Sequence, residues 1–239
     1  GYANDLLARE RARWPGLQLV EVGCPGETAI AAVLGGGPCT YPTGSQLLTA
    51  VQFLQAHRSA TVLVTVDLGF NDVRRCLDRR SIDPRCVPRA LAGVRRVLPG
   101  ALARLRAAGG RRMRIVGLEH PDPYVARFLG GRRGRHFATA SLGVFRRLNR
   151  TLGAVYRHAG APVANVPGVY GTASRRLTTL AGHGAVPVGV ARDCRFTWEC
   201  PPGPFAGNLH PNARGYRAIA RAVASAVGGV TPVTGRTAR

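Results

Sequence analysis

Acidic side chains are scarce in this sequence. Its 239 residues include 12 aspartates and glutamates against 34 lysines and arginines, which gives a formal net charge of +22. Such a charge first suggests a nucleic-acid partner. However, the arginines are scattered through every predicted helix, and basic stretches such as residues 131–135 contain no aromatic side chain. We therefore expect no specific nucleic-acid binding, but a solvated arginine surface that attracts anions non-specifically.

Long apolar runs are also missing. The best candidate for a membrane span, residues 218–230, is interrupted by Arg221, so a transmembrane segment is not expected. Residue 1 is glycine, and no basic stretch followed by an apolar stretch opens the sequence. We therefore expect that the start of this chain is processed or cropped.

The cysteine spacing of a zinc site is absent as well. None of the six cysteines has the close C-x2-C spacing with partner histidines that zinc requires. They form three local pairs, each within one predicted loop: Cys24 with Cys39, Cys76 with Cys86, and Cys194 with Cys200. Neighbours within one loop are the easiest to join, and a bridge across ~15 residues contributes about 3 kcal/mol. This arrangement predicts an exported protein in an oxidising compartment, the alternative being buried free thiols.

The length of the sequence and its apolar patterns predict one α/β domain at residues 1–227, followed by a flexible tail at 228–239. Short apolar runs predict strands at residues 17–22, 61–66, 113–118 and 163–166. Helices are predicted at residues 2–13, 45–57, 87–108 with an interruption near Pro99, 137–158 and 211–227. The alternation predicts a flavodoxin-like parallel sheet in a three-layer α/β/α sandwich. Residues 170–204 are expected to be rich in loops. Because the chain begins with a helix, the first and central strand of such a sheet is apparently absent.

Residues 61–72, with the sequence TVLVTVDLGFND, organise this prediction. The apolar β-branched half suits a strand buried on both faces of a parallel sheet. The turn at residues 69–72 follows at the carboxyl end of that strand, where ligands bind in open α/β sheets. Asn71 in this turn would offer an amide N–H to a developing oxyanion. The alternative is an Asn-Asp turn that caps the next helix.

Three blocks occur in a fixed order: Cys24-Pro25-Gly26-Glu27-Thr28, Gly69-Phe70-Asn71-Asp72, and Asn208-Leu209-His210-Pro211-Asn212. In this order and spacing the sequence resembles the SGNH hydrolases, also called GDSL esterases and lipases, over about residues 2–227. The PDP turn at residues 121–123 and the segment at 197–200 are lesser similarities. The six cysteines look like those of secreted actinobacterial members.

The resemblance implies roles for the matched residues. Gly26 would offer its backbone N–H, and Asn71 its side-chain amide, to the oxyanion of an acyl transfer. His210 would be the general base. The alternatives are a plain turn glycine and a histidine at a helix start. The other histidines, including His57, His120 and His183, have no motif around them, and we expect them to be structural or exposed. The chemistry needs neither a metal nor an organic cofactor.

The sequence departs from the family pattern at two places. It has no Gly-Asp-Ser block, and no serine follows an apolar strand and a strained turn. The serines concerned are Ser45, Ser59, Ser81, Ser141, Ser174 and Ser225. We therefore expect the nucleophile to lie outside this chain, on a strand before Gly1. The family's aspartate three residues before the histidine is replaced by Gly207, so Asn208 or the Gly207 carbonyl would orient His210.

The leading hypothesis is a secreted serine esterase or lipase that hydrolyses a small-molecule or lipid ester through an acyl-enzyme. We expect it to be a monomer. Alternatives are a non-catalytic SGNH-like protein that binds such esters, a carbohydrate acetylesterase, and a basic module that binds anionic polymers. Neither the substrate nor the acyl-chain length follows from the sequence, because one fold serves many reactions.

Overall fold

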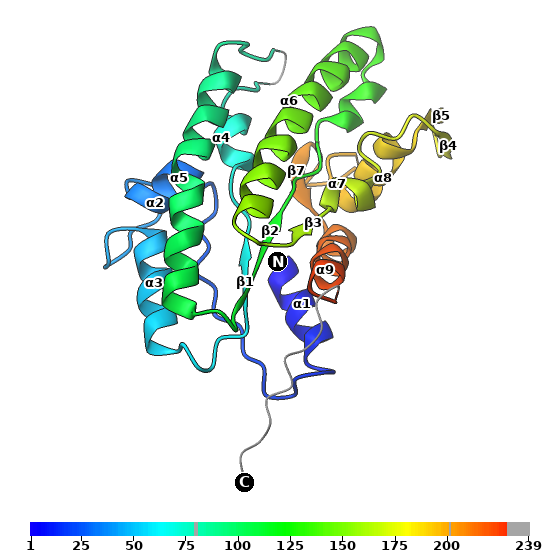
Figure 1. The fold of residues 1–239 in the computed structure, drawn as a ribbon. Coiled ribbons are helices and arrows are strands. Elements are labelled where there is room, and N and C mark those ends of the chain that lie inside the picture. The colour runs from blue at the N-terminus through cyan, green and yellow to red at the C-terminus, as the bar shows by residue number, and fades with distance from the viewer. Residues whose placement is uncertain (79–80, 201, 229–239) are drawn as a thin grey trace.

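Three parallel strands form the sheet at the centre of the protein (Figure 1). The computed structural model describes residues 1–78, 81–200 and 202–228. The strands β1 (Leu63–Val66), β2 (Arg114–Leu118) and β3 (Val163–Ala164) lie in the order β1-β2-β3. Leu63 pairs with Arg114, and Gly117 pairs with Val163. Short β-branched and apolar runs thus form this sheet, as the sequence predicts.

The strand predicted at residues 17–22 is wrong, because this segment is irregular in the structure. A strand needs a hydrogen-bonding neighbour, and the doubly wound order would place an additional strand between residues 17–22 and β1. On the side of that additional strand, β1 pairs with no described strand and so forms an edge of the sheet. Its first three residues are therefore only half-buried, and the expectation of burial on both faces is wrong for them.

Side chains of the sheet alternate between two core clusters. Val64, Val66 and Ile115 belong to or pack against the larger cluster, with the helices α2 (Ala29–Leu34), α3 (Gln46–Ala56), α5 (Cys86–Gly109) and α6 (Gly131–His158). Val116 and Leu118 belong to the second cluster, with α1 (Tyr2–Glu10), α7 (Val166–Tyr170) and α9 (Ala213–Gly228). In Figure 1, α3 and α5 lie on one side of the strands, and α1 and α9 lie on the other.

The helices mostly follow the predicted pattern, but α1 ends at Glu10 and not at residue 13, and α5 and α6 also differ from the prediction. The helix α5 runs unbroken through Pro99. The proline removes the hydrogen bond to the Arg95 carbonyl, but both residues are exposed, so water can hydrogen-bond to that carbonyl. The helix α6 begins at Gly131, six residues before the predicted start, so the basic stretch forms its first turn. As expected, Ser45 caps α3, its Oγ accepting from the Leu48 N–H at 3.2 Å.

The region expected to be loop-rich contains regular structure. The strands β4 (Leu177–Leu180) and β5 (Gly184–Pro187) form a hairpin, followed by α8 (Val188–Phe196). The strand β6 (Thr197–Trp198) then pairs antiparallel with β7 (Asn208–Pro211). A 3-10 helix (Val125–Leu129) and the short helix α4 (Phe70–Arg74) complete the fold. Apart from Gly228, which ends α9, the tail predicted at 228–239 lies outside the described residues.

Disulfides join the three local cysteine pairs named from the sequence. The bonds are Cys24–Cys39, Cys76–Cys86 and Cys194–Cys200. Each closes a short loop, and together they use all six cysteines. Within the described residues, no helix is both long enough and apolar enough to cross a bilayer.

Candidate active site

The turn at residues 24–28 is held in a defined shape. Gly26 has a φ of +79°, a conformation that favours glycine. The Cys24–Cys39 bond ties one end of the turn to the following loop. At the other end, Thr28 caps α2, its Oγ1 accepting from the Ala31 N–H at 3.2 Å. The backbone around Gly26 is therefore fixed from both sides.

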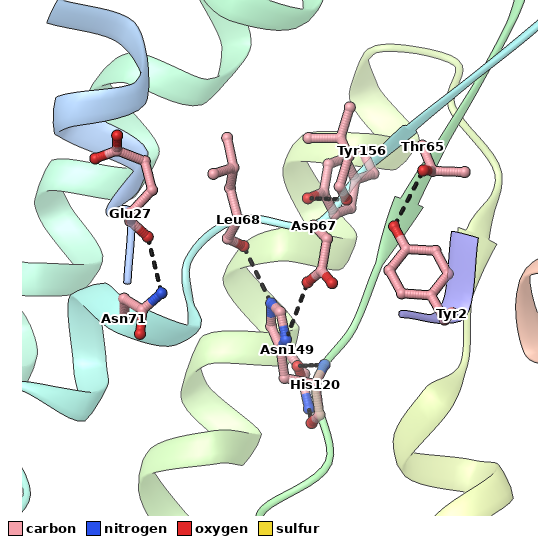
Figure 2. Close-up of polar contacts among 10 residues, drawn as sticks. Tyr2, Glu27, Thr65, Asp67, Leu68, Asn71, His120, Asn149 and Tyr156 are labelled. Carbon is pink, nitrogen blue, oxygen red and sulfur yellow. Dashed lines mark hydrogen bonds and ion pairs between the residues drawn. The ribbon is translucent and has the colours of Figure 1, made fainter. Parts of the chain in front are cut away.

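Asn71 reaches this turn from the next block of the sequence. Its Nδ2 donates to the carbonyl of Glu27, the neighbour of Gly26, at 2.9 Å (Figure 2). The adjacent Asp72 accepts from the Ala29 N–H at 2.8 Å, so its carboxylate caps α2. Burial raises the pKa of Asp72 above its ordinary value. Two side chains of α4 thus clamp the Gly26 turn against the end of β1.

His210 lies on the strand β7 and not at a helix start, which corrects the predicted helix at 211–227. Asn212 instead caps α9, its Oδ1 accepting from the Arg214 and Gly215 N–H groups at 2.9 and 3.1 Å. The His210 side chain is exposed. In the described chain, the imidazole makes no hydrogen bond, and Asn208 accepts from the His210 backbone N–H at 2.9 Å.

The structure therefore joins part of the predicted site directly. Asn71 and the Gly26 turn are hydrogen-bonded, but no hydrogen bond or ring contact links His210 to them among the described residues. Leu209 and Phe70, the sequence neighbours of His210 and Asn71, nevertheless pack against the same core cluster. An apolar hollow of about 270 Å³ beside α6 has Phe145 and Asn149 in its lining, and none of the predicted site residues.

His120 is the polar residue that the sequence reading missed. Of the two alternatives, structural or exposed, the structure agrees with the first: His120 is 7% exposed and lies among polar groups at the carboxyl ends of β1 and β2. Its Nε2 lies 3.1 Å from the Leu68 carbonyl, and its Nδ1 lies 3.5 Å from Asp67 Oδ1 (Figure 2). One signal was available: Asp67 comes one residue and His120 two residues after the end of a predicted strand, so both belong to the same edge of the sheet.

Two of the six serines are placed where they cannot attack a substrate. Ser141 is fully buried and donates to Asp122 Oδ2 at 2.7 Å, and Ser45 is 1% exposed and caps α3. Within the described residues, no serine is hydrogen-bonded to a histidine. The same part of the chain contains no group of three or more His, Cys, Asp or Glu side chains that could hold a metal ion.

Asp122, in the PDP turn, is an acid kept away from water. It is 1% exposed, and it accepts from the Ser141 hydroxyl and from the Tyr124 N–H at 2.9 Å. Burial raises its pKa from 3.8 to about 7, while these two hydrogen bonds oppose the shift. The neighbouring Asp193 is buried too, and desolvation raises its pKa in the same direction. The folded protein therefore retains protons that the unfolded chain releases.

This difference makes stability depend on pH. Between about pH 4 and 7 the folded state binds more protons than the unfolded state, so the free energy of unfolding falls as the pH rises. We expect Asp122→Asn to flatten this decline, because an amide does not ionise. Urea unfolding at pH 4.5 and 7.5 measures the slope, with Glu21→Gln as the exposed control. An identical slope in wild type and Asp122→Asn would contradict the assignment.

The protein is a mixed α/β protein with a three-stranded parallel sheet, and two side chains of α4 form a polar clamp just beyond the carboxyl end of β1. In open α/β sheets this edge is the usual place for a ligand. The particular family follows from comparison with known sequences. The chain belongs to the GDSL-like Lipase/Acylhydrolase family, whose model matches residues 1–218. Membership indicates ester hydrolysis in general. No curated protein and no solved structure matches the chain.

Proposed function

We propose that this protein is a serine esterase or lipase that hydrolyses carboxylic esters through an acyl-enzyme. The Gly26 N–H and the Asn71 amide would stabilise the oxyanion, and His210 would act as general base. The observation that carries the proposal is the 2.9 Å bond from Asn71 to Glu27, because it places an amide donor beside a turn glycine of positive φ. The second N–H of that amide has no acceptor in the described chain.

His210 suits the role of base better than the other histidines near the sheet edge. Its imidazole is exposed and free of hydrogen bonds in the described chain, whereas both ring nitrogens of His120 face acceptors of the protein itself. Asn208, or the Gly207 carbonyl, is proposed to orient the imidazole when substrate is bound.

The serine is proposed to come from polypeptide outside residues 1–239. A strand alongside β1 would complete the three-layer sandwich and would end at the same sheet edge as Asn71. The buried positions of Ser45 and Ser141 support this source. The proposed form is a secreted monomer whose catalytic domain includes residues 1–227. The lack of a serine–histidine contact in the described chain makes a non-catalytic ester-binding protein the second candidate.

The apolar part of the ester is proposed to lie against an aromatic pair beside His210. Trp198 pairs with Asn208 across β6 and β7, which places it two residues along the ribbon from His210. Its ring lies 5.4 Å from that of Phe205, and the two residues are 37% and 56% exposed. Exposed aromatic surface of this kind suits an acyl chain or another apolar group. A lipid ester or another acyl ester fits this surface.

Removal of the Asn71 amide tests the proposed function. In the N-terminally extended, serine-bearing protein, we expect Asn71→Ala to lower kcat for p-nitrophenyl butyrate by ~10²–10³-fold with little change in KM, because the donor acts on the transition state. Asn4→Ala, on the exposed face of α1, serves as the control. Circular dichroism should show the same fold in both variants. An unchanged kcat in Asn71→Ala would reject the oxyanion role.

A further inference from the structure

The backbone of His120 is bound to α6 by a single side chain. Asn149 Oδ1 accepts from the His120 N–H at 2.9 Å, and Asn149 Nδ2 donates to the His120 carbonyl at 2.8 Å. Figure 2 shows Asn149 beside His120, with the imidazole directed at the loop that follows β1. The ring therefore projects from a fixed point, and its contacts act on the loop and not on its own backbone.

Both ring nitrogens of His120 meet acceptors on consecutive residues of that loop. Leu68 offers a carbonyl 3.1 Å from Nε2, and because a carbonyl only accepts, Nε2 carries a proton. Nδ1 lies 3.5 Å from Asp67 Oδ1. In a neutral ring with its proton on Nε2, the lone pair of Nδ1 faces the Asp67 carboxylate. The imidazolium instead offers an N–H to each acceptor, so it matches the geometry better.

The groups that face His120 are mostly acidic. Asp67 lies at the end of β1, Asp72 lies on α4, and Glu119 precedes His120 at the end of β2. Burial raises the pKa of Asp72 and of Glu119, and the nearby imidazole opposes both shifts. Two cations lie among these groups: Arg157 on α6 faces Glu119, and Arg75 faces Asp72. Asp67, Asp72 and Glu119 are thus the acidic groups on this side of the ring.

The loop that His120 holds also carries Asn71. Gly69 fits closely against α6, where an added Cβ would lie 3.2 Å from Leu152 and 3.3 Å from Leu148. The Phe70 ring lies 5.8 Å from the His120 ring. Asn71 then donates to the Glu27 carbonyl at 2.9 Å. A shift at Leu68 is therefore transmitted along a short, packed segment to the amide beside Gly26.

We propose that His120 is a positioning residue: its imidazolium bridges the Leu68 carbonyl and the Asp67 carboxylate and so fixes the Asn71 amide against the Gly26 turn. When the ring loses its Nδ1 proton, the link to Asp67 is lost and the loop relaxes while the bond to Leu68 remains. The link itself is independent of ester hydrolysis. Only the effect of this link on catalysis rests on the proposed function.

The test uses the 239-residue chain and needs no activity. In ¹⁵N-labelled protein between pH 5 and 8, we expect the backbone amides of residues 68–71 and the Asn71 side-chain amide to titrate together with the His120 ring. His120→Gln keeps one donor for Leu68 but does not ionise, so the titration of these amides should disappear. Asp67→Asn, at a site 41% exposed, should reduce its amplitude at least ~2-fold. His183→Gln, in the exposed β4–β5 turn, should leave the titration unchanged.

Two results would overturn the proposal. Loop amides that stay fixed while His120 titrates would show that the ring does not position Asn71. An equal pH response in wild type and His120→Gln would assign the response to another group. If His120→Gln fails to fold, the half-exposed Asp67→Asn variant still decides, because an unchanged amplitude there contradicts the bridge. An absence of esterase activity would alter none of these outcomes.

Discussion

Replacing His210 with alanine is expected to lower kcat for a short-chain aryl ester by ~10⁴–10⁶-fold in the extended protein that contains the serine. Such a loss is characteristic of the general base in a nucleophile–histidine pair. The exposed imidazole makes no hydrogen bond in the described chain, so its removal leaves the fold unchanged.

The same experiment ranks Asn208 below His210. An asparagine supplies no negative charge to stabilise an imidazolium, and here its Oδ1 accepts from the His210 backbone N–H at 2.9 Å. Removal of this side chain should loosen β7 and disturb only the orientation of the ring. We therefore expect Asn208→Ala to retain most of the activity that His210→Ala loses.

Stopped assays with p-nitrophenyl butyrate at pH 8 measure both variants against wild type. His158→Ala, an exposed histidine at the end of α6, is the matched control and should keep full activity. Equal losses from Asn208→Ala and His210→Ala would contradict the ranking. Full activity in His210→Ala would move the role of base to another residue.

Much of the fold could be predicted because local patterns determine it. The apolar spacing along α5 and α6, and the β-branched runs of β1 and β2, form elements wherever a core is available. Residues 17–22 have a similar pattern but no strand. A strand depends on a neighbour that sequence periodicity does not provide. The hairpin β4–β5 was missed because its two strands are short and mostly exposed and lack the usual alternation of apolar and polar side chains.

The candidate site also contains residues that the sequence could place and residues that it could not. The Gly26 turn and Asn71 were both placed in the candidate site from their sequence blocks, and a hydrogen bond joins them although the strand predicted before Gly26 does not form. The role of His120 could not be predicted, because its partners are a backbone carbonyl and a carboxylate from a distant segment. The position of His210 on β7 depends on pairing with β6, which the sequence pattern did not indicate.

Ester hydrolysis is expected to be undetectable in the 239-residue polypeptide and to appear when polypeptide that forms a strand ending in serine is added before Gly1. Two independent observations support this result. Among the described residues β1 is an edge strand, with three of its four residues only half-buried. No described serine is hydrogen-bonded to a histidine, and Ser45 and Ser141 are buried.

A matched pair of extended proteins separates the sheet from the chemistry. Both the serine form and its Ser→Ala variant should be more stable than the 239-residue chain, since each backbone group that gains a partner contributes ~1 kcal/mol. Only the serine form should hydrolyse p-nitrophenyl butyrate and react with a serine-directed phosphonate. Labelling of Ser45, or full activity without the extension, would contradict the expectation. Higher stability in both forms with activity in neither would favour the ester-binding protein, because the completed sheet would then lack only the chemistry.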